Sequence, residues 1–157
     1  MNPCPCGYLG SERCDCSAEK IARYQGKISG PILDRIDLHI PVNNIENKQL
    51  FQAETQQQGE SNQQIRQRVC DARAIQMARQ GIVNARLNNQ QHKRVCPLNG
   101  QQQDFLDHAI NNYKLSTRSF HRLLKVARSI ADLAKRELPD IPEYQEALSY
   151  RNHFKAA

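Results

Sequence analysis

The chain contains 157 residues, of which 39% are hydrophobic and 6% aromatic, and it has no tryptophan. A chain of this length and composition builds one modest core, with room for a small appendage. The net charge of +6 is unevenly spread, because residues 1–61 carry 6 Lys+Arg against 8 Asp+Glu, whereas residues 62–157 carry 16 against 8.

The basic excess of the C-terminal part favours a polyanionic partner, either nucleotide phosphates or nucleic acid. The alternative is a solvated basic surface without a partner. No apolar run approaches the roughly 20 residues that cross a bilayer, and the N-terminus lacks the layout of a signal peptide. We therefore expect a soluble, cytoplasmic protein with no membrane partner.

The first 17 residues are rich in Cys, Pro and Gly, which predicts a loop. Two Cys-x-Cys pairs, separated by seven residues, supply four thiols: Cys4, Cys6, Cys14 and Cys16. Four thiolates at this spacing suit one tetrahedral zinc ion, in a structural site with no position left for water. Disulfides rarely persist in the cytosol, which favours zinc. The alternative is that the four cysteines serve only as small apolar side chains, because their Cys-x-Cys spacing is tighter than the usual Cys-x-x-Cys spacing of zinc sites.

The next segment predicts one helix and one short strand. Ser17 is a suitable N-cap for a helix that continues to about Ile28, and Gly30-Pro31 would end it. Apolar residues alternate with polar ones over residues 36–42, the period-two pattern of a strand with one buried face. Pro41 indicates either that this strand lies at the edge of a sheet or that the strand ends at this residue.

A glutamine-rich segment divides the two charge regimes, and we place a domain boundary there, giving residues 1–60 and 61–157. Ser61 and Gln64 have the spacing of a capping box, so we expect a helix from Asn62 to Gln80 that Gly81 stops. Residues 81–99 are expected to be irregular. The remaining thiols, Cys70 in this helix and Cys96 in the following loop, are expected to be buried rather than to bind metal.

Three further helices are predicted in the C-terminal part. The first covers Asp104–Tyr113, and the last begins after Asp140 and continues to about His153. The strongest periodic signal lies between them, after Ser116 as N-cap, and forms one apolar helical stripe: Phe120, Leu123, Leu124, Ala127, Ile130, Ala131 and Ala134. The expected fold is mainly α, a helical bundle preceded by a remnant with one short strand.

Two arginines stand at positions that suit contact with phosphate. Arg35 lies at the predicted helix-to-strand junction, and its planar, permanent charge suits a transferring phosphoryl group. The plainer interpretation is a surface arginine paired with Asp34 or Asp37. Arg118 lies in the first turn of the long helix, where N–H groups favour an anion, but the residues alone favour an exposed arginine on a basic helix.

Three ordered blocks resemble the C-terminal third of magnesium-chelatase-like AAA+ ATPases of the ComM/YifB type, which is associated with DNA branch migration in natural transformation. The blocks are Asn2–Gly7, Gly30–Leu38 and Leu115–Leu133. The resemblance implies that residues 1–60 are the end of an α/β AAA+ core and residues 61–157 are its helical lid.

The resemblance also implies roles for three residues. Arg35 would act as an arginine finger in a neighbouring subunit's site, and Arg118 would be the sensor-2 arginine that contacts the γ-phosphate. Asn2 would be the sensor-1 residue that orients the attacking water. ATP and magnesium would be cofactors of the parent protein, which would form rings and remodel DNA as a competence-related helicase.

The chain has no G-x-x-x-x-G-K-S/T loop, so we expect it not to hydrolyse ATP alone. Met1, directly before Asn-Pro-Cys-Pro-Cys, is best interpreted as an initiator added to an excised piece. One competing interpretation is a non-enzymatic Cys4 zinc module whose basic helices bind nucleic acid. Another is a protein-interaction helical domain without a nucleotide role.

Overall fold

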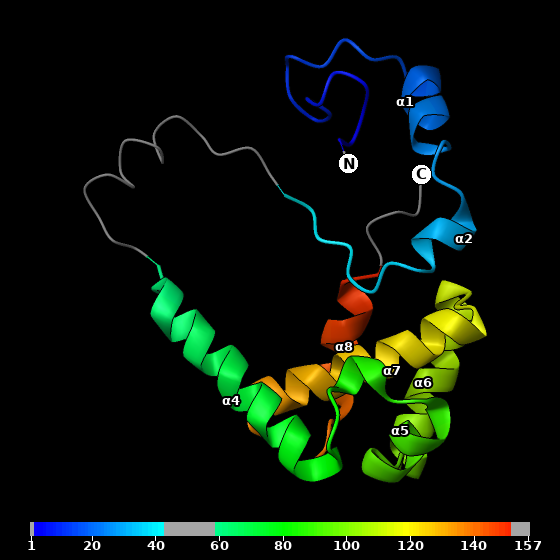
Figure 1. Ribbon diagram of the computed structural model, residues 1–157. Helices are drawn as coiled ribbons and strands as arrows, with labels where there is room; N and C mark the ends of the chain where they lie inside the picture. The colour runs from blue at the N-terminus through cyan, green and yellow to red at the C-terminus, as the bar shows by residue number, and fades with distance from the viewer. Residues whose placement is uncertain (1, 43–58, 152–157) are drawn as a thin grey trace. The chain divides into compact units, whose positions relative to one another are not determined.

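The computed structural model describes residues 2–42 and 59–151. By their internal contacts the residues form two compact units, one up to Ile36 and one from Asp37 onward. Helices are the only regular elements in the described residues, which confirms the expected mainly α fold (Figure 1).

The first unit contains a cysteine-rich loop followed by two short helices. Helix α1 (Ala18–Gln25) begins where expected, because the Ser17 hydroxyl accepts a hydrogen bond from the Lys20 N–H, but it ends three residues before Ile28. Gly30 and Pro31 open a second helix, α2 (Gly30–Leu33), instead of ending the first. Proline is well suited to the first turn of a helix because its missing N–H would have no partner there.

The predicted strand at residues 36–42 is not formed. A strand needs a partner for its backbone groups, and no second strand occurs in the described parts of the chain. Its alternating apolar residues stay exposed, from 43% at Ile36 to 92% at Val42. The backbone of this segment donates from the Ile36 N–H to the Leu33 carbonyl at 3.0 Å and from the His39 N–H to the Tyr150 carbonyl at 2.7 Å.

The second unit opens with helix α4 (Asn62–Gln80), which has the predicted bounds. Ser61 and Gln64 form the expected capping box, and Gly81 ends the helix with φ of 74°. The following segment is not irregular as expected. It contains a 3₁₀ turn, η1 (Asn84–Arg86), and helix α5 (Asn89–Val95), which begins with a second capping box.

Three helices complete the unit. Helix α6 (Gly100–Tyr113) begins four residues before the predicted Asp104, because Asn99 caps it. Helix α7 (Thr117–Leu133) follows its predicted N-cap, Ser116. Helix α8 (Ile141–Ser149) follows the predicted cap of Asp140 and ends before His153, which lies outside the described residues.

Helix α7 is the centre of this unit, and it packs against α4, η1 and α8, while α6 packs against α8. The predicted stripe of α7 faces the core, except that Ala134 is exposed at the C-cap. The core cluster combines residues of α6, α7 and α8: Leu106, Ala109, Leu123, Leu124, Ala127, Tyr144, Ala147 and Leu148. Cys96 is buried as expected, whereas Cys70 is exposed, so that part of the prediction was wrong.

Candidate nucleotide-contacting residues and a four-cysteine cluster

The four cysteines of the N-terminal loop come together in space. Their Sγ atoms all lie within 4.8 Å of one another, and none is in a disulfide. The Cys4 and Cys6 sulfurs are 3.3 Å apart, and the Cys14 sulfur lies 3.9 Å from that of Cys4 and 3.7 Å from that of Cys6. This convergence gives the loop the only group of three or more candidate metal-ligating side chains in the described residues.

The thiols do not ionise independently. Burial raises the pKa of Cys4, but hydrogen bonds from Cys6, Gly7 and the other thiols outweigh it and hold this pKa at about 7. A hydrogen bond from the Cys16 backbone lowers the pKa of Cys14, but burial, the bonds with Cys6 and Cys4 and the charge of Cys4 together raise it to about 11. The neighbouring thiols therefore favour the thiolate of Cys4 and disfavour those of Cys14 and Cys16, whose pKa values are raised.

Asn2 belongs to the same loop as the thiols. Its exposed side chain lies over Gly7, where the Cβ of any larger residue would be 3.6 Å from the Asn2 Nδ2 atom. The following residue, Pro3, accepts a hydrogen bond on its carbonyl from Gln25 Nε2 at 2.9 Å. The loop that carries Asn2 is thus fastened to the end of α1.

The two candidate arginines are both exposed and lie on different units. Arg35 follows α2 in a turn, where its N–H donates to the Ile32 carbonyl at 3.0 Å. Arg118 lies in the first turn of α7, two residues after Ser116, whose hydroxyl accepts from the Ser119 N–H at 3.1 Å. Arg151 also donates to the Ser119 hydroxyl, at 2.8 Å, which holds the start of this helix.

Two arginines of the basic C-terminal part are internal rather than on its surface. Arg128 is 1% exposed and Arg79 is partly buried, and both donate to Asp132, which is also 1% exposed. Sequence reasoning assigned Asp132 no role. The four-residue spacing of Arg128 and Asp132 on one helix was the signal that could have indicated the pair.

Other cations of the second unit also have partners within it. Arg122 of α7 pairs with Asp37 at 2.6 Å, so this aspartate already has a partner within the unit. Lys125 donates to the Ala85 carbonyl, and Arg136 pairs with Glu143. The basic excess of this part is therefore partly neutralised by contacts within the fold.

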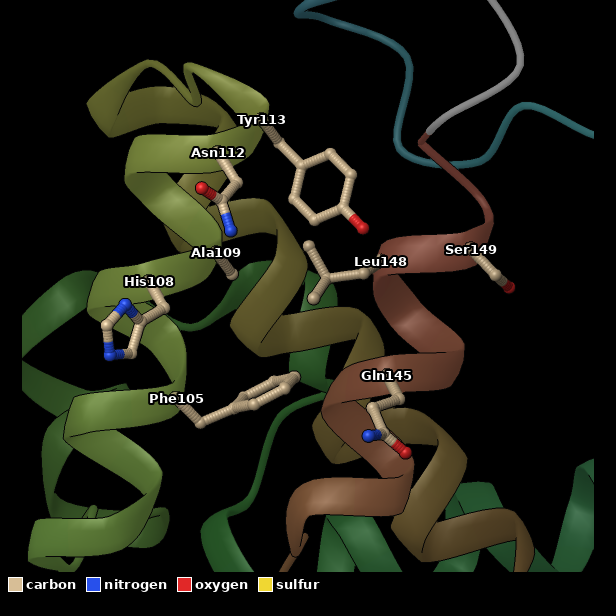
Figure 2. A pocket seen from close by; sticks show the side chains of 8 residues that line it. All are labelled: Phe105, His108, Ala109, Asn112, Tyr113, Gln145, Leu148 and Ser149. Carbon is tan, nitrogen blue, oxygen red and sulfur yellow. The ribbon is translucent and has the colours of Figure 1, made fainter.

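An open pocket lies between α6 and α8 (Figure 2). It is lined from α6 by Phe105, His108, Ala109, Asn112 and Tyr113, and from α8 by Gln145, Leu148 and Ser149. None of the predicted site residues lines it. Separately, no helix of the described residues combines the length and apolar character needed to cross a membrane.

Comparison with known proteins assigns the chain to a family. The model of the magnesium chelatase subunit ChlI C-terminal region matches residues 59–151, and that of magnesium chelatase subunit ChlI matches residues 1–50. The chain therefore belongs to the magnesium chelatase ChlI family, as the three sequence blocks indicated.

Among individual relatives, competence protein ComM of Haemophilus influenzae is 42% identical over 151 residues. The uncharacterized protein YifB of Escherichia coli is 36% identical over 155 residues. Each match covers 96% of this chain, but the chain spans only 29% of the length of either relative.

Proposed function

We propose that this chain is the part of an AAA+ motor that completes ATP sites between the subunits of a ring. Arg35 acts in trans as the arginine finger, Arg118 as the sensor that contacts the γ-phosphate, and Asn2 as the residue that orients the attacking water. ATP and Mg²⁺ are bound mainly by the rest of the parent protein, and hydrolysis drives remodelling of DNA. The name of the relative ComM supports a role in competence.

The observation that carries this proposal is the exposure of both arginines within a chain that belongs to the magnesium chelatase family. A finger must leave its own subunit to reach a neighbour's phosphate, and Arg35 lies on a turn directly after α2. Arg118 lies where the first N–H groups of α7 add a favourable dipole to its charge. These groups act by electrostatic positioning and form no covalent intermediate.

The test uses the full-length parent protein. Arg35→Ala should leave nucleotide binding intact and reduce ATP hydrolysis by on the order of a thousandfold, the effect typical of such fingers. Arg23→Ala is the matched control, because this exposed arginine of the same unit pairs with Glu19 on its own helix and should leave hydrolysis unchanged.

A mixing experiment separates action in trans from action within one subunit. Rings are assembled from Arg35→Ala subunits and subunits that lack the lysine of the phosphate-binding loop. A trans finger predicts recovered hydrolysis, because some interfaces then contain both parts. No recovery in rings shown to be mixed contradicts the proposal.

The DNA partner is tested separately by measuring the affinity of the ring for branched DNA against salt concentration. Contacts to phosphates release counterions, so the affinity should fall steeply as salt rises. Equally tight, salt-dependent binding by this chain alone, together with full hydrolysis by Arg35→Ala rings, would instead favour a nucleic-acid-binding module without an enzymatic role.

A further inference from the structure

We propose that Cys4, Cys6, Cys14 and Cys16 bind one zinc ion in a closed structural site that holds the N-terminal loop. The site is independent of the nucleotide chemistry proposed above, because it needs no second subunit and no phosphate. It accounts for four thiols that converge in a loop with little other packing, since Cys4 alone is buried among residues 2–17.

The sulfur positions match the coordination shell of a single ion. A tetrahedral zinc with Zn–S bonds of about 2.3 Å places its sulfurs about 3.8 Å apart. The separations between the Cys4, Cys6 and Cys14 sulfurs are 3.3, 3.7 and 3.9 Å, and every pair lies within 4.8 Å. A disulfide requires about 2.05 Å, so none of these contacts is one.

The loop backbone is built to bring the two Cys-x-Cys pairs together. Gly7 and Gly10 both have φ near +85°, a conformation that other residues rarely adopt. The Gly7 N–H donates to the Cys4 carbonyl at 3.1 Å, which closes the first turn around the thiols. The Cys14 N–H donates to the Ser11 carbonyl at 3.0 Å, which directs the second pair back toward the first.

The donor set determines both the metal and its role. Four thiolates are soft ligands that favour zinc over Mg²⁺ or Ca²⁺, which require oxygen. The four sulfurs occupy all four positions, so no place is left for a water or a substrate, and the ion is structural.

Metal binding should order the first unit and leave the second unchanged. The loop contacts the rest of its unit through the Pro3 carbonyl, which Gln25 holds, so the ion fixes the segment from Asn2 to α1. The second unit has its own apolar core and none of the four thiols. Amide exchange should therefore speed up in residues 2–25 after metal removal and remain unchanged in α7.

The experiment measures metal content in the chain purified under reducing conditions without chelator and dialysed against trace zinc. Elemental analysis should find one zinc per chain. Each of Cys4→Ser, Cys6→Ser, Cys14→Ser and Cys16→Ser should lower the zinc affinity at least tenfold. The matched controls Cys70→Ser and Cys96→Ser should each retain one zinc, because these thiols lie outside the cluster.

A cobalt titration of the metal-free chain keeps the test decisive if a variant folds poorly. One Co²⁺ per chain should produce the visible bands of a tetrahedral tetrathiolate site, and one equivalent of zinc should abolish them. Octahedral cobalt, no saturation at one equivalent, or several iron atoms with sulfide in the native protein would overturn the proposal. Loss of zinc in Cys70→Ser together with its retention in Cys14→Ser would also overturn it.

Discussion

Arg79 and Asp132 form a two-pronged ion pair that joins α4 to α7. The Arg79 Nη1 atom lies 2.6 Å from Asp132 Oδ1, and its Nη2 atom lies 3.0 Å from Oδ2. The same carboxylate accepts from Arg128 at 2.8 Å and from the Asn84 side chain at 2.8 Å. One aspartate near the end of α7 thus connects α4, η1 and α7.

Asp132→Ala should destabilise the second unit strongly. Without the carboxylate, the wholly buried Arg128 guanidinium keeps its charge but loses its counter-ion, a change that typically costs about 3–5 kcal/mol. Urea unfolding followed by circular dichroism measures the loss. Asp71→Ala is the control, because its pair with the exposed Lys135 is 3.6 Å long and should contribute no more than about 1 kcal/mol. Equal losses in the two variants would contradict this prediction.

The second unit should lose stability in mild acid through His92. Burial lowers the pKa of His92 from 6.5, and the charges of Lys125, His121 and Arg128 lower it further against the opposing hydrogen bond with the Leu124 backbone. Between the folded and unfolded pKa values the unfolded chain therefore binds more protons. The free energy of unfolding should be unaffected by His92 well above pH 6.5 and should decrease as the pH falls below it.

This pH dependence is measured by urea unfolding at a series of pH values. His92→Gln should flatten the decrease below pH 6.5, whereas the exposed control His108→Gln should leave it unchanged. His121 has a pKa lowered in the same direction, so a smaller slope should persist in His92→Gln. An identical slope in His92→Gln and the unsubstituted chain would argue against His92 as the group.

The two thiols outside the cluster should react at very different rates. Cys96 is 2% exposed, lies 3.6 Å from the Tyr144 hydroxyl and has a pKa that burial raises, so little thiolate is accessible. Cys70 is exposed on α4. Brief alkylation followed by peptide mass spectrometry should label Cys70 and spare Cys96 until urea is added. Similar labelling of both in the native chain would mean that the core opens readily.

Residues 59–151 should fold without the rest of the chain. They contain the whole apolar core cluster and the Asp132 network, together with every helix from α4 to α8. A chain of these residues should show helical circular dichroism and one cooperative urea transition. Unfolding of residues 59–151 is compared with that of the same residues carrying Asp132→Ala. If the two urea transitions are equally broad, the domain boundary near residue 61 is misplaced.

The sequence predicted correctly those features that depend on interactions within a few residues along the chain. The capping box of Ser61 and Gln64, followed by Gly81, determined both ends of α4, and the stripe on α7 identified the buried face. Cysteine spacing likewise predicted that four thiols would converge. These features depend on backbone geometry and periodicity, which a single sequence records directly.

Features that depend on distant partners were not predictable in the same way. The alternation at residues 36–42 indicates an extended backbone, but a strand also needs a neighbour that the sequence does not specify. Helix α5 was missed because its only buried residue is His92, so it lacks an apolar stripe. The internal position of Arg128 depends on Arg79 and Asn84, which belong to other elements.

Several glutamines of this glutamine-rich chain form capping boxes at the starts of helices. Three of the four boxes are built from uncharged side chains, with Gln64, Gln91 and Gln102 at the third helical position. Amides neither titrate nor carry a charge that salt screens, so the capping boxes of α4, α5 and α6 should persist in acid and in concentrated salt. Helix α8 alone among these begins with a carboxylate pair, and Gln102 Nε2 reaches its Asp140 at 3.2 Å. The neutral cap of α6 thereby stabilises the only capping box of the four that protonation can weaken.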